Sequence, residues 1–277
     1  MNLQKFIGRK HLPIDYQNDR LYKACKALEP FLDQLVLVGG WAFRVQMDIF
    51  RDAERYTSDA DFAIQLASKE VFEEISNHLL YQGFQCVQLP NKMKRLDILP
   101  YSFINNETRI EILPFGKYAQ EIIDLDLREY RLAFDENEII IVRNTEDDTL
   151  SLKIVTIPSL VIMKIFSFSD KWSERLKDLN DISYITINYG KDEDKYGLTV
   201  KKKEWLEERY IDYEFASTHL LGRKVQSKIH DSIFLEAKDR LVKILDWIRN
   251  AYSEESERYK RLEILLEYFQ DRYEPSL

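Results

Sequence analysis

The chain has 277 residues, a formal net charge of -8 at pH 7 and a hydrophobic content of 45%. This composition predicts a globular protein of one large or two smaller domains, and it argues against a chain that coats nucleic acid nonspecifically. Cys25 and Cys86 lack metal-ligand spacing and are as expected for free thiols in a reducing compartment. There is no signal-peptide core, and no apolar run approaches the roughly 20 residues that a membrane span needs, so we expect a cytoplasmic protein without a membrane segment.

Strand and helix patterns alternate through the first part of the chain. We expect, in order, a helix from Asn18 to Leu32, a strand from Leu35 to Val38, a helix that starts at Gly39, a strand that holds Asp59 and Asp61, a helix from Lys69 to Tyr81 and a strand from Phe84 to Leu89. The apolar residues of the Lys69 helix recur with a helical period, and Gly83 ends it.

The next segments predict the rest of a sheet and then a helical region. The strands Arg95 to Leu99 and Thr108 to Leu113 are expected to form a hairpin through Asn105-Asn106, and two β-branched runs at 138–142 and 151–155 close the sheet. Helices are expected at 159–166 and 178–187, and from Lys201 to the end. We therefore predict an α/β fold, with a mixed sheet and flanking helices in residues 1–156 and a helical C-terminal domain in residues 157–277.

Two aspartates one residue apart are the most informative feature of the sequence. Asp59 and Asp61 lie in the run Arg55-Tyr56-Thr57-Ser58-Asp59-Ala60-Asp61-Phe62. Side chains at i and i+2 of a strand point to the same face, so the two carboxylates can share a pair of divalent cations. The spacing predicts a metal site for a nucleotide.

A two-metal site needs a further carboxylate from another strand. Glu111 is the best candidate, because it is an acid inside the apolar run Ile110-Glu111-Ile112-Leu113, where an unpaired carboxylate would cost several kcal/mol to bury. Asp97 is the rival. Either residue could instead be a strand side chain that reaches solvent.

Gly39-Gly40 comes at the end of a strand and the start of a helix. Backbone amides at a helix N-terminus can hold a phosphate, so we expect a triphosphate between this turn and the metals. Thr57 or Ser58 would add a hydroxyl donor beside Asp59, although both could be plain turn residues.

Together these blocks resemble the polymerase-beta-like nucleotidyltransferase superfamily, and within it the AbiEii-type nucleotidyltransferases, many of which are toxins of toxin-antitoxin pairs. The resemblance is carried by Gly39-Gly40-Trp41-Ala42, by the run from Arg55 to Phe62 and by Arg109-Ile110-Glu111-Ile112-Leu113-Pro114-Phe115-Gly116. It extends to Ile157-Pro158-Ser159-Leu160-Val161-Ile162-Met163-Lys164 and to Arg175-Leu176-Lys177-Asp178-Leu179-Asn180-Asp181-Ile182, which look like that group's lysine helix and Lys-Asp-x-x-Asp helix. Glu111 departs from the aspartate that such families usually carry.

The resemblance implies roles for these residues. Asp59 and Asp61 would hold two Mg²⁺ ions, Glu111 would hold the catalytic ion and help to deprotonate the acceptor hydroxyl, and Lys164 would neutralise triphosphate charge. Arg55, Thr57, Ser58 and the two glycines would bind the nucleotide. Asp178 and Asp181 would orient Lys164 or Arg175 by ion pairing, with a surface salt-bridge network as the alternative.

The resemblance also implies a reaction. A nucleoside monophosphate would pass from a nucleoside triphosphate such as ATP to an acceptor hydroxyl, either on RNA such as a tRNA or on a protein, with a cognate antitoxin as a further partner. The alternatives are a small-molecule acceptor, as in antibiotic-modifying relatives, and a degenerate protein that binds nucleotide without turnover. The basic runs Lys92 to Arg95 and Lys201 to Lys203 could face RNA or could be solvated surface.

Overall fold

The chain divides into two compact units, Met1–Thr156 and Ile157–Leu277. We describe them from a computed structural model in which the described residues are 16–49, 57–87, 101–106, 108–119, 127–144, 146, 148–190, 207, 212–228, 231–251 and 256–270. The expected strand at 95–99, its acid Asp97, the residue Arg55 and the two basic runs lie outside these residues. Each unit is treated by itself below.

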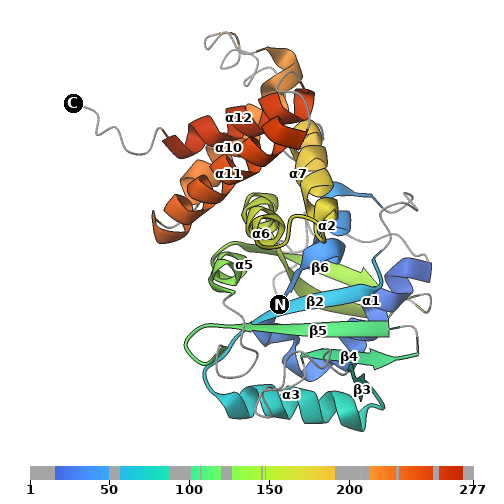
Figure 1. Ribbon diagram of the computed structural model, residues 1–277. Coiled ribbons are helices and arrows are strands. Elements are labelled where there is room, and N and C mark those ends of the chain that lie inside the picture. Colours follow the sequence, from blue (N-terminus) through green and yellow to red (C-terminus); the bar gives the residue numbers. More distant parts are fainter. Residues whose placement is uncertain are drawn as a thin grey trace. The chain divides into compact units, whose positions relative to one another are not determined.

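A mixed sheet forms the framework of the first unit (Figure 1). Its seven described strands are β1 (Leu35–Val38), β2 (Asp59–Gln65), β3 (Gln85–Cys86), β4 (Ser102–Asn105), β5 (Thr108–Phe115), β6 (Asn137–Arg143) and β7 (Thr149–Val155). Their order across the sheet is β3-β4-β5-β2-β1-β7-β6. The pairs β1–β7 and β2–β5 are parallel and the others are antiparallel. This arrangement confirms the predicted α/β class.

Burial explains why these segments form strands in this order. β1 is an interior strand between β2 and β7, and all four of its residues are buried. In β2 and β5 apolar side chains alternate with polar ones, so Phe62, Ile110 and Ile112 are 0% exposed on one face while the acids stand on the other. The alternation places every charged candidate of these two strands on a single face.

Helices and short turns of helix complete the first unit. They are α1 (Tyr16–Ala27), η2 (Glu29–Gln34), α2 (Gly39–Met47), α3 (Lys69–Tyr81), η4 (Arg128–Tyr130) and α5 (Arg131–Asp135). α2 packs against β1 and β2, and α1 packs against β5, β6 and β7. α3 buries Phe72, Ile75 and Leu79, whose spacing matches one helix face.

The predicted hairpin through Asn105-Asn106 has β4 as the described part of its first strand, and the expected strand at 95–99 lies outside the described residues. β4 (Ser102–Asn105) pairs with β5, and the register joins Asn105 to Thr108. The turn at Asn106 was predicted correctly, and its φ of 50° is one that asparagine tolerates. A turn this short requires the strand immediately before it as the partner. Since β2 pairs with the other edge of β5, that strand has both of its edges occupied.

The regular elements of the second unit, among its described residues, are all helices. Its elements are α6 (Ile157–Asp170), α7 (Leu176–Asn188), η5 (Tyr213–Phe215), α10 (Ala216–Lys228), α11 (Asp231–Ala251) and α12 (Glu257–Gln270). α6 packs against α7 and α11, and α12 packs against α10 and α11. Phe234 and Phe269 from the predicted apolar stripes stack with centroids 5.0 Å apart, so these stripes form core.

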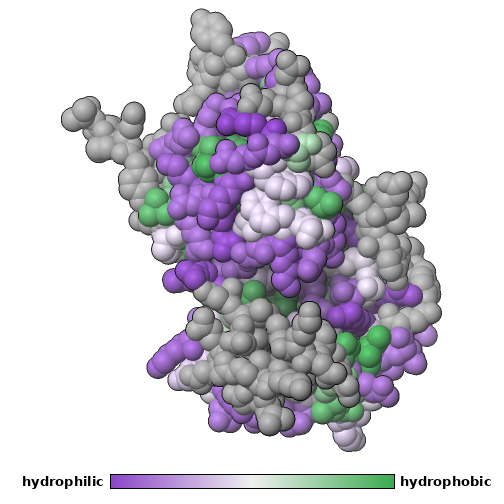
Figure 2. Space-filling model, in the orientation of Figure 1, coloured by the Kyte–Doolittle hydropathy of each residue, from purple (hydrophilic) through white to green (hydrophobic). Residues whose placement is uncertain are grey.

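The face of the helical unit seen in Figure 2 is predominantly hydrophilic, with small scattered apolar patches. Among the described residues, no helix is both long and apolar enough to cross a membrane.

Candidate functional site

Three of the predicted acids lie on adjacent strands of the sheet in the first unit. Asp59 and Asp61 stand two residues apart on β2, and Asp61 is the register partner of Glu111 on β5. Register partners on neighbouring strands point to the same face, so the three carboxylates are close neighbours on one partly exposed surface. The structure therefore brings together the acids that the sequence singled out. We call these three residues and Arg109 the acidic cluster.

Arg109 is a member of this cluster that the sequence interpretation did not assign. It is the register partner of Asp59 and lies two residues before Glu111 on the same strand face. Its Nη2 donates to Glu111 Oε1 at 2.8 Å, and its Nε lies 3.8 Å from Asp59 Oδ1. The guanidinium thus bridges acids from two strands.

Ser102 from β4 supports the same contact. Arg109 Nε donates to Ser102 Oγ at 3.1 Å, and Ser102 Oγ donates to Glu111 Oε1 at 3.4 Å. Tyr101 precedes it, and the pKa of the Tyr101 phenol is raised by burial and then by the negative charge of Glu111. Glu111 therefore lies in a polar setting formed by three strands.

The two glycines approach the cluster from β1 and α2. Gly39 has a φ of 66°, and a Cβ added to it would lie 2.0 Å from Asp61 Oδ2. A Cβ on Gly40 would lie 2.8 Å from Thr57 Oγ1. Glycine is required at the first position both by its backbone conformation and by the contact with Asp61. The N-terminus of α2 consequently lies beside the Asp-x-Asp pair.

Local side-chain hydrogen bonds organise the start of β2. Ser58 Oγ donates to Asp59 Oδ1 at 2.5 Å, and Thr57 Oγ1 donates to the carbonyl oxygen of Asp59 at 3.4 Å. Among the described residues, no side chain caps the N-terminus of α2. Its first-turn amides are the kind of donor that binds phosphate in other proteins.

The donor set of the acidic cluster fits a divalent cation, because carboxylate oxygens are the ligands that Mg²⁺ prefers. A positive charge is already held between Asp59 and Glu111, where Arg109 lies. Within the described part of the chain, however, no group of three or more His, Cys, Asp or Glu side chains is arranged so that it could hold a metal ion. The acids are adjacent, but the guanidinium stands between two of them.

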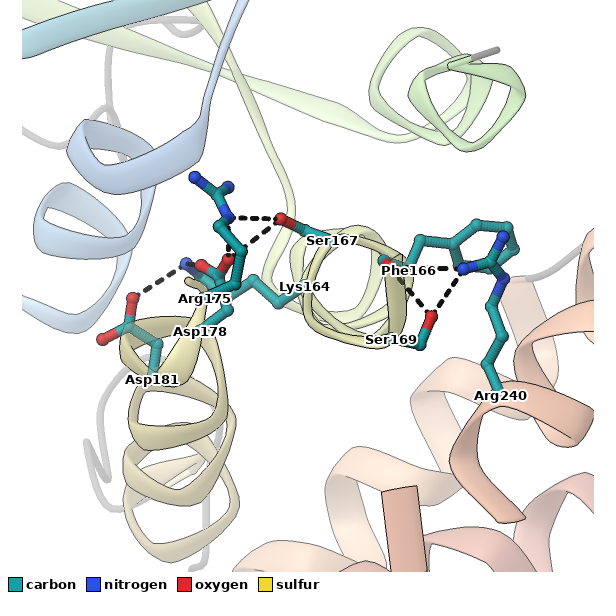
Figure 3. A network of polar contacts seen from close by, with 8 residues as sticks. All are labelled: Lys164, Phe166, Ser167, Ser169, Arg175, Asp178, Asp181 and Arg240. Carbon is teal, nitrogen blue, oxygen red and sulfur yellow. Dashed lines mark hydrogen bonds and ion pairs between the residues drawn. The ribbon is translucent and has the colours of Figure 1, made fainter. Parts of the chain in front are cut away.

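A second set of predicted residues lies in the helical unit, where Figure 3 shows it between α6 and α7. We call Lys164, Ser167, Arg175, Asp178 and Asp181 the lysine network. Lys164 Nζ lies 2.9 Å from Asp178 Oδ1 and 2.8 Å from Asp181 Oδ2, and its side chain is only 5% exposed. The i,i+3 spacing of the aspartates puts both on the face of α7 that meets this lysine.

The second carboxylate oxygen of Asp178, Oδ2, also has partners. Arg175 Nε lies 2.8 Å from Asp178 Oδ2, and Ser167 Oγ donates to the same oxygen at 2.9 Å. Arg175 Nε also donates to Ser167 Oγ at 2.8 Å. The structure thus brings together Lys164, Arg175 and both aspartates, and the i,i+3 spacing of the aspartates allows both to reach the lysine.

The ion pairs of the lysine network shift the pKa values of Lys164 and Asp178 toward their charged forms. Burial alone would lower the pKa of Lys164, but the carboxylates of Asp178 and Asp181 outweigh it and raise the pKa above its ordinary value. Burial alone would raise the pKa of Asp178, but Lys164 and then Arg175 lower it below its ordinary value. Both groups are therefore charged at neutral pH.

A neighbouring contact on α6 joins it to α11. Arg240 donates from Nη1 to Ser169 Oγ at 2.5 Å and lies over the ring of Phe166, with Cζ 4.3 Å from the centroid (Figure 3). No sequence pattern predicts this contact, because Arg240 is one of many charged residues on an amphipathic helix. It fixes α6, the helix that carries Lys164, against the rest of the helical unit.

A mixed sheet with an Asp-x-Asp pair beside a diglycine helix start is what we expected of a nucleotidyltransferase. The family model described as "Nucleotidyl transferase AbiEii toxin, Type IV TA system" matches residues 20–251. The chain therefore belongs to the AbiEii nucleotidyltransferase family, which confirms the resemblance read from the sequence. Membership makes the chain a nucleotidyltransferase in a toxin-antitoxin setting and implies a nucleoside triphosphate substrate and a cognate antitoxin.

Other comparisons add little. Among solved structures, the chain is similar to the antibiotic-resistance factor ANT(2'')-Ia, a structure described as revealing substrate-regulated conformation dynamics, with 9% sequence identity and a TM-score of 0.37. The match covers 70% of this chain and 96% of that one. At that level the similarity carries no argument about the acceptor. No curated protein matches the sequence of this chain.

Proposed function

We propose that the chain is a Mg²⁺-dependent enzyme that transfers a nucleoside monophosphate from a triphosphate such as ATP to a hydroxyl of a macromolecule. The supporting observation is the position of Asp61, which lies beside Glu111 on one side and against the backbone of Gly39 on the other. That position joins carboxylate oxygens to helix amides, which are respectively the ligands of magnesium and of phosphate.

The roles of the residues follow from this arrangement. Asp59 and Asp61 would hold two Mg²⁺ ions, and Glu111 would bind the catalytic ion. Bound magnesium would supply charge neutralisation on the triphosphate. The amides at Gly39 and Gly40 would orient the phosphates.

The remaining chemistry is proton transfer and positioning. A carboxylate at Glu111 is suited to accept the proton of the acceptor hydroxyl, because it belongs to the partly exposed face of the sheet and not to the core. Transfer of a nucleotidyl group asks mainly for alignment and stabilised charge, which these residues can supply without covalent catalysis. A triphosphate contact of Lys164 stays a prediction, and its ammonium is held by Asp178 and Asp181.

The two units correspond, in this proposal, to a nucleotidyltransferase domain at residues 1–156 and a helical C-terminal domain at residues 157–277. The leading acceptor is RNA such as a tRNA, or a protein of the toxin-antitoxin setting. Family membership favours these macromolecules over an antibiotic-like small molecule.

Incubation with each α-labelled nucleoside triphosphate would test the proposal. Parallel reactions would contain Mg²⁺ or EDTA, and total tRNA, a cell protein extract, or a panel of aminoglycosides and lincosamides. We expect label on tRNA or on a protein only with Mg²⁺. Label on a small molecule alone would support the antibiotic-type alternative. Magnesium-dependent nucleotide binding without transfer to any acceptor would overturn the catalytic proposal in favour of a degenerate binding protein.

A further inference from the structure

The position of Arg109 suggests how the acidic cluster is held together before it binds metal. The guanidinium contacts Glu111 at 2.8 Å and Asp59 at 3.8 Å, from the same sheet face. Three carboxylates on one face repel each other, and a cation between two of them relieves that repulsion. Arg109 is therefore placed where its charge does the electrostatic work of a metal ion.

The contact with Glu111 is built from more than one strand. Glu111 Oε1 accepts hydrogen bonds from Arg109 Nη2 and from Ser102 Oγ, and Ser102 Oγ in turn accepts one from Arg109 Nε. This closed triangle fixes the direction in which the carboxylate points. A guanidinium is also a rigid, permanently charged donor, so it does not leave by losing a proton.

We propose that Arg109 is an internal counter-cation of the acidic cluster, and that a divalent ion binds at Glu111 by displacing its guanidinium. This inference rests on the proposed function, because it takes the metal site as given. An oxygen that accepts two hydrogen bonds must exchange at least one of them before it can bind a metal. The apparent metal affinity is consequently lowered by the fraction of molecules in which Arg109 still holds Glu111.

The exposure of the contact makes such an exchange feasible. The side chain of Arg109 is 36% exposed and that of Glu111 is 19% exposed, so the guanidinium can move into water without crossing the core. A buried ion pair would be too costly to open, whereas a partly exposed pair is worth little. Arg109 thus stabilises the metal-free cluster and still gives way to an ion.

Titration of the metal-free protein with Mn²⁺, with free Mn²⁺ followed by electron paramagnetic resonance, would test this inference without nucleotide or turnover. In Arg109→Gln we expect binding about three- to tenfold tighter than in the wild type, as for the loss of a partly exposed like charge. Arg109→Lys keeps the charge and loses the fork geometry, so its affinity should lie between the two.

The matched control is Arg131→Gln. Arg131 belongs to the same unit and pairs with Asp135 on α5 at 3.4 Å. Its helix packs at the other end of β5, where Phe134 contacts Phe115 with centroids 4.9 Å apart. The control removes the same charge and should leave Mn²⁺ affinity unchanged. In the background of Glu111→Gln, the gain from Arg109→Gln should disappear.

Thermal unfolding gives a second readout. Without metal, Arg109→Gln should melt at a lower temperature than the wild type, because the carboxylates lose their counter-cation. With saturating Mn²⁺ the variant should show the larger increase in melting temperature. If Arg109→Gln binds Mn²⁺ no more tightly than the wild type does, the counter-cation inference is wrong and the proposed function still stands. Absence of Mn²⁺ binding in every protein, the wild type included, would overturn both.

Discussion

The acidic cluster of the first unit and the lysine network of the second both combine acidic and basic side chains, but in different ratios. The first combines three carboxylates with the one guanidinium of Arg109, on side chains that are 19–36% exposed where they pair. The second sets Lys164 and Arg175 against two aspartates, and the pair Lys164–Asp178 is 5% and 4% exposed. Among these named residues, negative charge is in excess in one place and matched in the other.

This difference separates two uses of ionised side chains. Carboxylates in excess and in partial contact with water can take up a further cation at modest cost. Carboxylates that are buried and matched are already satisfied, and each partner there prevents the other from being an isolated buried charge. Substitution of a carboxylate in the first place should therefore act mainly on activity, and substitution of a charged partner in the second mainly on stability.

The largest expected effect is on catalysis, from Asp61→Asn. Loss of a carboxylate that would hold both metals should lower nucleotidyl transfer by about a thousandfold or more, comparable to the loss of a strong transition-state contact. The free energy of unfolding should change little, because Asp61 is partly exposed. Labelled transfer and urea denaturation would measure the two. Asp135→Asn on α5 is the control, and turnover above a tenth of the wild-type rate in Asp61→Asn would contradict the metal assignment.

The next effect is on stability, from Lys164→Met. Removing the ammonium leaves the buried Asp178 and the partly buried Asp181 without their shared cation, so unfolding should become easier by about 3–5 kcal/mol. Urea denaturation followed by circular dichroism would measure this change. Lys171→Met, at an exposed position just beyond α6, should change the unfolding free energy by less than about 0.5 kcal/mol.

A double substitution sharpens the same comparison. Asp178→Asn should cost less in the Lys164→Met background than in the wild type, because its pairing with Lys164 is already lost. Additive costs would show that the two residues are not coupled, against the contacts seen in Figure 3. A loss of transfer by Lys164→Met that exceeds its loss of folded protein would support the predicted triphosphate contact of this lysine.

A third prediction concerns how the difference in unfolding free energy between the wild type and Lys164→Met depends on pH. The pKa of Lys164 is raised, so its stabilisation is complete below the ordinary value of 10.5 and is lost as the pH rises through the folded value. The pKa of Asp178 is lowered, so its stabilisation is complete above 3.8 and is lost as the pH falls through the folded value. Urea denaturation at several pH values should show that the wild type and Lys164→Met differ in unfolding free energy by the same amount from about pH 5 to about pH 9. A steady slope across that window would refute this assignment of charge.

Sequence patterns predicted most of the fold and the acids of the site, for identifiable reasons. β1 is four apolar residues, and the helix from Lys69 to Tyr81 repeats its apolar residues with a clear period, so both elements are where their patterns placed them. Asp59 and Asp61 were found because carboxylates that alternate with apolar residues are unusual in a strand. Such signals are local in sequence.

Contacts that depend on register could not be found in the same way. Ser102 was missed because it lies beyond the strand that was expected at 95–99, and only the pairing of β4 with β5 brings Ser102 opposite Glu111. Arg109 did carry a signal, since it lies two residues from Glu111 and must share its face. An arginine on an open sheet face is nevertheless common, and only the register with Asp59 distinguishes it. Arg55 and Asp97 stay predictions.

The smallest expected effects come from the Gly39-Gly40 turn, which lies beside the proposed phosphate and metal ligands. They are measured by comparing the stability of Gly39→Ala with that of Gly40→Ala. At Gly39 a methyl group would meet Asp61 Oδ2 at 2.0 Å on a backbone with φ of 66°, which should destabilise the protein by about 1–2 kcal/mol and push the carboxylate aside. At Gly40 the methyl group would lie 2.8 Å from the Thr57 hydroxyl, which can rotate away, and 3.1 Å from Thr57 Cβ, which needs only a small shift, so the loss should be about 1 kcal/mol or less.

Metal affinity separates the two variants more clearly than stability does. Gly39→Ala displaces a predicted ligand and should weaken Mn²⁺ binding about tenfold, whereas Gly40→Ala should leave the affinity within about twofold of the wild type. Equal weakening in both variants would mean that the turn acts on the acids as a whole and not through Asp61. Weakening confined to Gly39→Ala would link the start of α2 to the Asp-x-Asp pair through one carboxylate, which is the connection that a shared site for triphosphate and metal requires.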